Sequence, residues 1–234
     1  MSAPDRVRVD MVRIDGANGY DLFVADPEAT VGDYLAALNR AIEELPLDRG
    51  RARRRECKGC DRCCAERLPL TAVDARVLRR ATGAPTLSAF LALYGHVLVD
   101  GRAVDITLAR REDGRCCFLD CGTRTCRLYT ARPLVCQTFI CSPQTKRARR
   151  LREVLVNKGE DELVRQWLGE PGATGREPLI HEGYSPRVRA ADWPATPFAG
   201  CEGYDEILLR EVCPPGIWRE LTTEMAAGEP SPVR

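Results

Sequence analysis

The chain has 234 residues, with 35 Lys and Arg against 34 Asp and Glu, 44% hydrophobic residues and 12 cysteines. A formal net charge of +1 argues against a protein whose main partner is a polyanion, and the composition excludes the disordered and collagen-like classes. A chain of this length can bury roughly 70% of its unfolded surface. It therefore does not need disulfides to fold, and the cysteines require another explanation.

The N-terminal sequence and the apolar stretches predict the compartment. The charged run Asp5-Arg6-Val7-Arg8 lies close to the first residue, and the apolar core of a signal peptide is not found there. The longest stretch without charged side chains, Ala81–Val99, contains two glycines and a proline and is too broken for a membrane span. We expect a cytoplasmic protein, in which thiols stay reduced and clustered cysteines indicate metal or redox chemistry.

The first part of the chain predicts a strand pair and a helix. Strands over 6–14 and 20–24 flank a turn-rich stretch. Thr30 then begins a helix that runs to Leu45, with Asp33 at the third position in a weaker form of the capping box. Pro46 ends this helix.

The middle of the chain predicts two short helices and strand-like pieces. Thr71 caps a helix to about Thr82, with Gly83 as its stop, and a second helix spans Leu87–Tyr94. Strands are expected over 96–99, 102–110 and 116–119, separated by turns that each carry an Asp-Gly pair.

The last part predicts mainly helices. Ser142-Pro143 opens the longest one, to about Asn157, Lys158-Gly159 breaks it, and 160–168 continues. Short helices are expected over 204–212 and 217–227. The fold class is therefore α+β: a helix-rich single domain with a small antiparallel sheet and cysteine-lined loops. We divide it into an N-terminal strand and helix segment (1–50), a cysteine-cluster core (51–145) and a C-terminal helical segment (146–234), within one globular unit.

The first cysteine cluster has the pattern C-x2-C-x2-C-C and comprises Cys57, Cys60, Cys63 and Cys64. Spacing by two residues lets successive thiolates converge on one metal centre, as at the start of the bacterial ferredoxin motif. Cys63 and Cys64 are adjacent and cannot easily reach the same metal atom. We expect one of them to bind the metal and the other to serve a second centre or to support the first.

The second cluster has the pattern C-x8-C-x9-C-x4-C and comprises Cys117, Cys126, Cys136 and Cys141. The neighbouring apolar side chains would limit the access of solvent to a metal; they are Phe118, Leu119 and Leu128. Arg132 could donate to a carbonyl or an inorganic sulfide. No role is assigned to the remaining cysteines, which are Cys116, Cys121, Cys201 and Cys213.

These motifs, together with Cys126-x-x-Tyr129 and Arg132-Pro-x-x-Cys136, resemble the YkgJ-type cysteine-cluster family, described as a zinc- or iron-chelating domain. The resemblance covers about 57–141 and implies metal binding by seven cysteines, which are Cys57, Cys60, Cys63, Cys64, Cys117, Cys126 and Cys136. Cys141 lies outside the shared pattern and is expected as an eighth ligand, and the remaining cysteines leave an extra centre open. The sequence departs from the family at Asp61, where the family has Gly, and at Gln137, where it has Arg. The first signature also resembles the flagellin lysine N-methylases, which are associated with an iron–sulfur cluster, although no glycine-rich fingerprint for the methyl donor is found.

Two metals compete for these ligands. Three closely spaced cysteines fit a 4Fe–4S cluster better than a zinc ribbon, which uses two C-x2-C pairs. We favour an iron–sulfur cluster, with zinc as the alternative. The function would be metal or cluster handling or redox; the alternatives are a cluster-dependent enzyme such as a lysine N-methylase and a zinc-stabilised interaction module.

The remaining features are assigned structural roles. His96 and His181 are too few and too isolated for Cys2His2 sites. Basic runs at 51–55 and 146–152 lack the aromatic residues and motif of a nucleic-acid site, and charges on a helix are usually a solvated face. We expect a metal or cluster as partner and leave a protein partner open; we expect no membrane and no nucleic acid.

Overall fold

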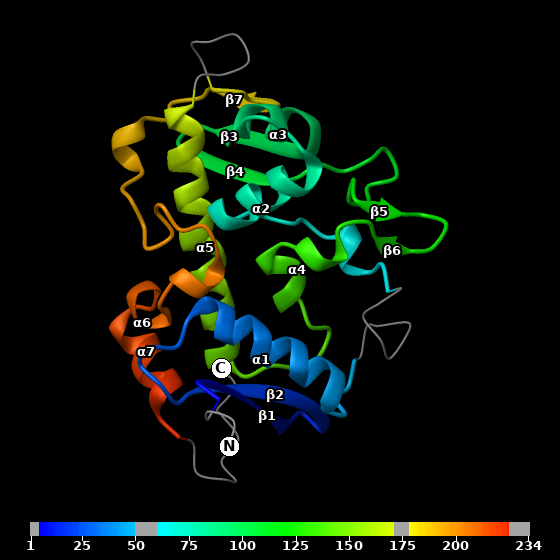
Figure 1. Cartoon of the computed structure of the whole chain (residues 1–234), viewed down its shortest axis with the longest axis vertical. Helices are drawn as coiled ribbons and strands as arrows, with labels where there is room; N and C mark the ends of the chain where they lie inside the picture. Colours follow the sequence, from blue (N-terminus) through cyan, green and yellow to red (C-terminus); the bar gives the residue numbers. More distant parts are fainter. Residues whose placement is uncertain (1–4, 50–59, 171–177, 225–234) are drawn as a thin grey trace. The chain divides into compact units, whose positions relative to one another are not determined.

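A computed structural model describes residues 5–49, 60–170 and 178–224 of the chain (Figure 1). The described residues form two compact units. The first unit comprises 5–49, 137–155 and 203–224, and the second comprises 60–136, 156–170 and 178–202. The architecture is helix-rich α+β with small sheets, as the sequence predicts.

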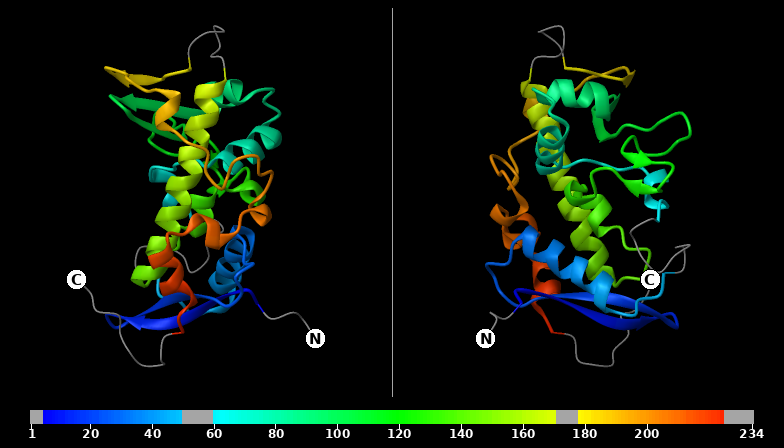
Figure 2. Two further views of the ribbon diagram at one scale, coloured as in Figure 1. Left: turned by 90° about the vertical axis from the view of Figure 1, so that its left-hand side faces the viewer. Right: turned by 45° about the vertical axis from the view of Figure 1, so that its right-hand side comes forward.

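The first unit begins with the predicted strand pair. β1 (Val7–Ile14) and β2 (Ala17–Val24) are antiparallel and joined by Asp15-Gly16, whose φ angles of 48° and 80° suit the tight hairpin turn that an Asp-Gly pair favours. α1 (Val31–Glu44) packs along this ribbon (Figure 2). The predicted capping box is confirmed, because Thr30 and Asp33 each accept a backbone N–H from the other.

The C-terminal helices of the first unit are shorter than expected. A single turn at Tyr204–Glu206 precedes α6 (Leu209–Val212), so the continuous helix over 204–212 was wrong. α7 (Pro215–Thr222) begins at a proline, which tolerates the first helical position. Residues 225–227 of the expected last helix lie outside the described residues.

The longest helix, α5 (Lys146–Gly169), is uninterrupted. The predicted start at Ser142 was wrong because Pro143 is extended beside β2 and its carbonyl accepts the N–H of Tyr20 at 3.0 Å. The predicted break at Gly159 was also wrong. An added Cβ there would lie 2.4 Å from Cγ2 of Thr71, so this glycine permits a close helix contact instead of ending the helix.

One charge of the basic run at 146–152 is buried, against the expectation of a solvated face. The side chain of Arg147 is 9% exposed and forms a bidentate pair with Asp21 on β2, at 2.8 and 2.6 Å. Its remaining donor reaches the carbonyls of Glu220 and Thr223, both at 2.8 Å. Arg147 therefore ties three segments of the first unit together.

The second unit contains the helices that the sequence predicts. α2 (Ala72–Thr82) starts with a capping box of Thr71 and Asp74 and stops at Gly83, whose φ is 72°. α3 (Leu87–Tyr94) follows. The three-stranded sheet has the order β4-β3-β7, with β3 (Gly95–Asp100) antiparallel to β4 (Ala103–Leu108). β7 (Glu182–Tyr184) adds to β3 in parallel, which the sequence did not predict.

The cysteine-rich part of this unit is less regular than expected. The strand over 116–119 was wrong, because the N–H of Leu119 donates to the carbonyl of Cys116 and turns the chain. Only β5 (Leu119–Asp120) and β6 (Thr125–Cys126) pair there. α4 (Leu134–Thr138), which was not predicted, follows a turn at Tyr129–Ala131. This part packs against a core that includes Phe90, Val97, Ile106 and Trp167.

Candidate metal centre

The described end of the first cluster is a tight turn that presents three partly exposed thiols. The turn spans Cys63–Ala65, and the N–H of Cys64 donates to the carbonyl of Asp61 at 3.1 Å. Cys60, Cys63 and Cys64 are all partly exposed and unoxidised. Cys57 lies outside the described residues.

A second pair of adjacent cysteines lies beside this turn. Cys116 follows the Asp113-Gly114 turn, and its N–H donates to the carbonyl of Cys64 at 2.7 Å. The same stretch is tied to β4's end by a bridge between Arg110 and Cys116. Backbone pairing thus brings the pairs Cys63–Cys64 and Cys116–Cys117 together, although 51 residues lie between Cys64 and Cys116 in the sequence.

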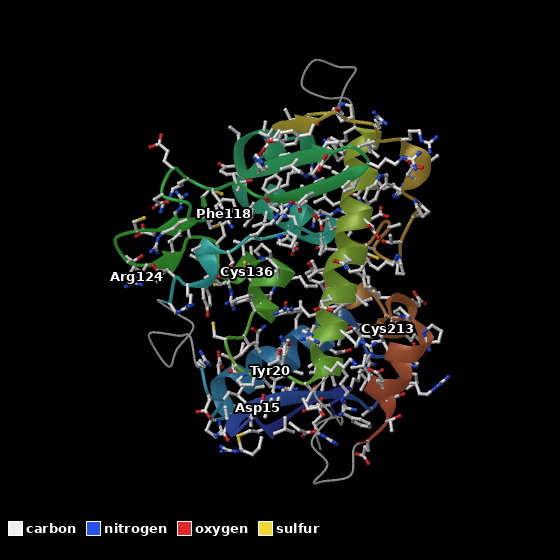
Figure 3. The ribbon with its side chains drawn as sticks, turned by 180° about the vertical axis from the view of Figure 1, so that it is seen from behind. Asp15, Tyr20, Phe118, Arg124, Cys136 and Cys213 are labelled. Carbon is white, nitrogen blue, oxygen red and sulfur yellow. The ribbon has the colours of Figure 1, made fainter. Side chains whose placement is uncertain are left out.

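Cys126 and Cys136 come from two further elements. Cys126 ends β6, where it pairs with Leu119. Cys136 lies on α4, whose first N–H, that of Leu134, donates to the buried carboxylate of Asp74 at 2.8 Å. Asp74 also belongs to the capping box of α2, so one carboxylate fixes both helix starts. Figure 3 labels Cys136 and Phe118; Phe118 is buried in the core against which Cys117 and Cys136 pack.

The thiols of these segments lie within electrostatic range of one another. In addition to hydrogen bonding and burial, the negative charges of Cys63 and Cys116 raise the pKa of three further thiols, those of Cys64, Cys126 and Cys136. Within each adjacent pair, one thiol hydrogen-bonds the other: this bond lowers the pKa of Cys63 and of Cys116 and raises the pKa of Cys64 and of Cys117. Because burial raises the pKa of both Cys126 and Cys136, a nearby cation is needed for these thiols to become thiolates at neutral pH.

Arginine side chains surround the thiols. Asp61, between Cys60 and Cys63 in the sequence, accepts from Arg124 and Arg115, and its side chain is 10% exposed. The hydrogen bonds from Arg124, followed by those from Arg115, lower the pKa of Asp61 to about 2. Figure 3 shows Arg124 on the loop that connects β5 to β6. The ion pairs link the first cluster to the segment that carries the second.

Arg132 behaves as the sequence predicts. Its Nε donates to the carbonyl of Tyr129 at 3.1 Å, and its guanidinium group lies 4.0 Å from the centre of the Tyr129 ring. The predicted apolar wall is present as well: Phe118 and Leu119 are buried, and Leu128 packs against the same core. This wall shields one side of the thiols from water.

The remaining cysteines lie in other surroundings. Cys141 belongs to the first unit, in the loop after α4. Cys121 is exposed, and its sulfur accepts from Arg111 at 2.6 Å. The thiol of Cys201 donates to the carbonyl of Pro197 at 3.4 Å, while Cys213 is buried at the end of α6.

The two histidines have structural partners. The Nδ1 atom of His181 accepts the N–H of Val97 at 3.0 Å, and its ring stacks on that of His96 at 5.5 Å. Because Nδ1 of His181 accepts this backbone hydrogen bond, the His181 ring helps to attach the segment that precedes β7 to strand β3.

The donor set fits a metal that prefers sulfur. Buried thiols with amide and guanidinium donors suit zinc or iron–sulfur ligation. In the part of the chain that the structure describes, no three His, Cys, Asp or Glu side chains already converge to hold one ion.

Residues 56–158 match the model of the CxxCxxCC family, described as "Putative zinc- or iron-chelating domain". This segment is similar to the CxxCxxCC family. The matched segment contains the two adjacent-cysteine pairs as well as Cys126 and Cys136, and the family description supports metal chelation. Searches of curated proteins and of solved structures found no match. Among the described residues, no helix is long and apolar enough to cross a membrane.

Sequence reasoning gave Cys116 no role, yet this residue belongs to the thiol region of the matched segment. Its side chain is buried, its N–H donates to the carbonyl of Cys64, and it interacts electrostatically with Cys63, Cys64 and Cys136. The signal that could have identified it is the second Cys-Cys pair, which repeats the end of the first motif.

Proposed function

We propose that the second unit holds an iron–sulfur cluster through cysteines of its two clusters and acts in metal or cluster handling or in redox chemistry. The observation that carries the proposal is the gathering of thiols from four chain segments in one unit. These segments contain Cys63–Cys64, Cys116–Cys117, Cys126 and Cys136. These six thiols form no disulfides, and thiols are the donors that zinc and iron–sulfur clusters take.

The arrangement of donors around the thiols is compatible with iron–sulfur ligation, which the spacing of three cysteines in the first motif supports. The N–H of Phe118 donates to the sulfur of Cys116 at 3.5 Å, and the N–H of Leu128 bonds the sulfur of Cys126. Hydrogen bonds of this kind set the potential of an iron–sulfur cluster. Nearby guanidinium groups offset the negative charge that several thiolates would carry.

Each group of residues at the site would have a distinct role. The cysteines bind, Asp61 with its two arginines holds the first cluster against the second, and the wall of Phe118 and Leu119 excludes water from one side. When bound, the cluster would supply electron transfer or a transferable metal. Cys57 and Cys60 would complete the ligand set from the first motif, and Cys141 stays a predicted further ligand.

The first experiment is anaerobic purification of the full chain followed by analysis of iron, zinc and acid-labile sulfide. We expect a brown protein with iron and sulfide in equal amounts. Zinc bound without iron or sulfide would replace the proposal by a zinc-stabilised interaction module, and a chain that binds neither metal would overturn it. Binding of S-adenosylmethionine in calorimetry would instead support the methylase alternative.

Metal removal provides a second test. Chelation, or Cys60→Ser, should lower the melting temperature by several degrees, since a metal shared by two chain segments stabilises the folded state. Cys201→Ser is the matched control, because Cys201 bonds a carbonyl of its own loop. An unchanged melting curve after chelation would contradict a site shared by these segments.

A further inference from the structure

Cys116 is the best-shielded thiol of the cluster region. Its side chain is buried, with 5% of the residue exposed, whereas Cys60, Cys63, Cys64, Cys117, Cys126 and Cys136 are partly exposed. Its sulfur accepts the N–H of Phe118 at 3.5 Å. A thiol whose sulfur accepts an amide hydrogen bond is prepared to act as a thiolate.

The backbone holds the two adjacent-cysteine pairs side by side. The N–H of Cys116 donates to the carbonyl of Cys64 at 2.7 Å, a short bond that leaves little freedom between the two pairs. Cys63, Cys64, Cys126 and Cys136 all lie within electrostatic range of Cys116. Cys116 therefore belongs to this group of interacting thiols.

The thiols of this region outnumber the four donors that one tetrahedral metal ion takes, because the two adjacent-cysteine pairs together with Cys126 and Cys136 supply six sulfurs. A pair of adjacent cysteines beside a second such pair thus addresses two metal positions, and each position can receive one sulfur from each pair. Further cysteines can then complete each position to the usual four donors; Cys126 and Cys136 are the described candidates.

We propose that Cys116 is a metal ligand, and that Cys63–Cys64 with Cys116–Cys117 hold at least two neighbouring metal atoms, either two ions or two irons of one cluster. This inference rests on the proposed metal-binding function and adds to it a ligand outside the predicted set. On binding, each ligating sulfur gives up its proton to solvent.

Differential alkylation of the native full chain tests the assignment without a mutation. The protein is loaded with zinc alone and treated with iodoacetamide at a fixed moderate urea concentration, with and without chelator, and labelled cysteines are identified by mass spectrometry. We expect Cys116 to be protected with zinc and labelled after chelation. Cys201 in the same unit and Cys213, buried to a similar degree at 6% exposure, report the general stabilisation by zinc, and the protection of Cys116 should exceed theirs.

The outcomes separate the two proposals. Protection of Cys60 or Cys63 by zinc without protection of Cys116 would overturn this inference and leave the metal site standing. A chain in which zinc protects none of the cluster cysteines, and which holds neither iron nor sulfide after anaerobic purification, would overturn the proposed function itself. A chain that binds one zinc ion and holds no iron–sulfur cluster would refute the arrangement of two neighbouring metal atoms.

Substitution gives an independent measurement. Cys116→Ser should weaken zinc binding by roughly tenfold or more, as loss of a ligand does, and should lower the thiolate-to-metal absorption of the cobalt-substituted protein. The matched variant Cys121→Ser, which removes an exposed thiol of the same segment, should change neither. If Cys116→Ser folds, as judged by circular dichroism, and keeps the full cobalt spectrum, Cys116 is not a ligand.

Discussion

Replacement of Asp61 by Asn tests whether the ion pairs around this residue hold the two cysteine clusters together. Asp61 accepts three hydrogen bonds, from Nη1 of Arg115 and from Nε and Nη2 of Arg124, with the Nε bond at 3.1 Å. Asn keeps one acceptor oxygen and turns an amide N–H2 toward the guanidinium groups. At least one charge-assisted bond is therefore lost and a repulsive contact is added.

The size of the effect follows from exposure. A hydrogen bond between charged groups contributes about 1.5–3 kcal/mol when it is shielded from water. Here the side chains of Arg115 and Arg124 are 39% and 40% exposed, and both can recover water in the variant. We therefore expect Asp61→Asn to cost about 1–2 kcal/mol. If the same free energy is needed to bring the two clusters together for metal binding, the zinc dissociation constant should rise about 5- to 30-fold.

The assay combines urea denaturation of the metal-free chain with zinc competition against a chromogenic chelator. Asp192→Asn is the matched control, because Asp192 pairs with Arg189 at an exposed site of the same unit. We expect the control to retain the wild-type zinc affinity. If Asp61→Asn binds zinc as tightly as Asp192→Asn does, the ion pairs do not organise the metal site and the reasoning fails.

Three further predictions concern the folded state. Arg147→Ala should lower the free energy of unfolding by about 3–5 kcal/mol in urea titrations, since it leaves the carboxylate of Asp21 buried without its cation. Burial raises the pKa of Glu160 to about 7 in the folded state. As the pH rises from about 4 to 7, the unfolded chain loses this proton before the folded chain does, so the free energy of unfolding should fall. Glu160→Gln should remove that fall and be more stable at pH 8 by about 1–2 kcal/mol. Gly159→Ala should destabilise by about 1–3 kcal/mol, because its Cβ would overlap Thr71.

Two of these have a control variant within the same helix. Arg149→Ala removes an exposed arginine and should change stability by about 0.5 kcal/mol or less. Gly169→Ala adds a Cβ into open space and should not destabilise. A stability that does not depend on Glu160 between pH 4 and 7 would contradict the raised pKa, and an Arg147→Ala variant no weaker than Arg149→Ala would contradict the buried ion pair.

Local signals predicted the regular elements well. Thr30 and Thr71 begin helices because their side chains accept the first free N–H groups, and Gly83 ends one because it adopts a positive φ. Such features depend on a few neighbouring residues and can be read from sequence. β7 and α4 were missed because each is short and is stabilised by a distant partner, β3 for one and Asp74 for the other.

Gly159 and Arg147 show where local reasoning fails. A glycine in a helical stretch predicts a break, but here it allows α5 to approach Thr71. An arginine in a basic run predicts a solvated face, but Arg147 faces Asp21 across the first unit. In both cases a residue distant in sequence decides the role.

The sequence by itself determined the chemistry of this protein: cysteine spacing indicates a metal-chelating segment, and the family match to 56–158 agrees. Only the tertiary structure decided which thiols meet. Cys116 lies beside Cys64 because of one backbone hydrogen bond between segments far apart in the chain, and Asp61 faces Arg115 and Arg124 for the same reason. Ligand spacing is a local property, whereas the convergence of several ligand segments depends on how the whole unit packs.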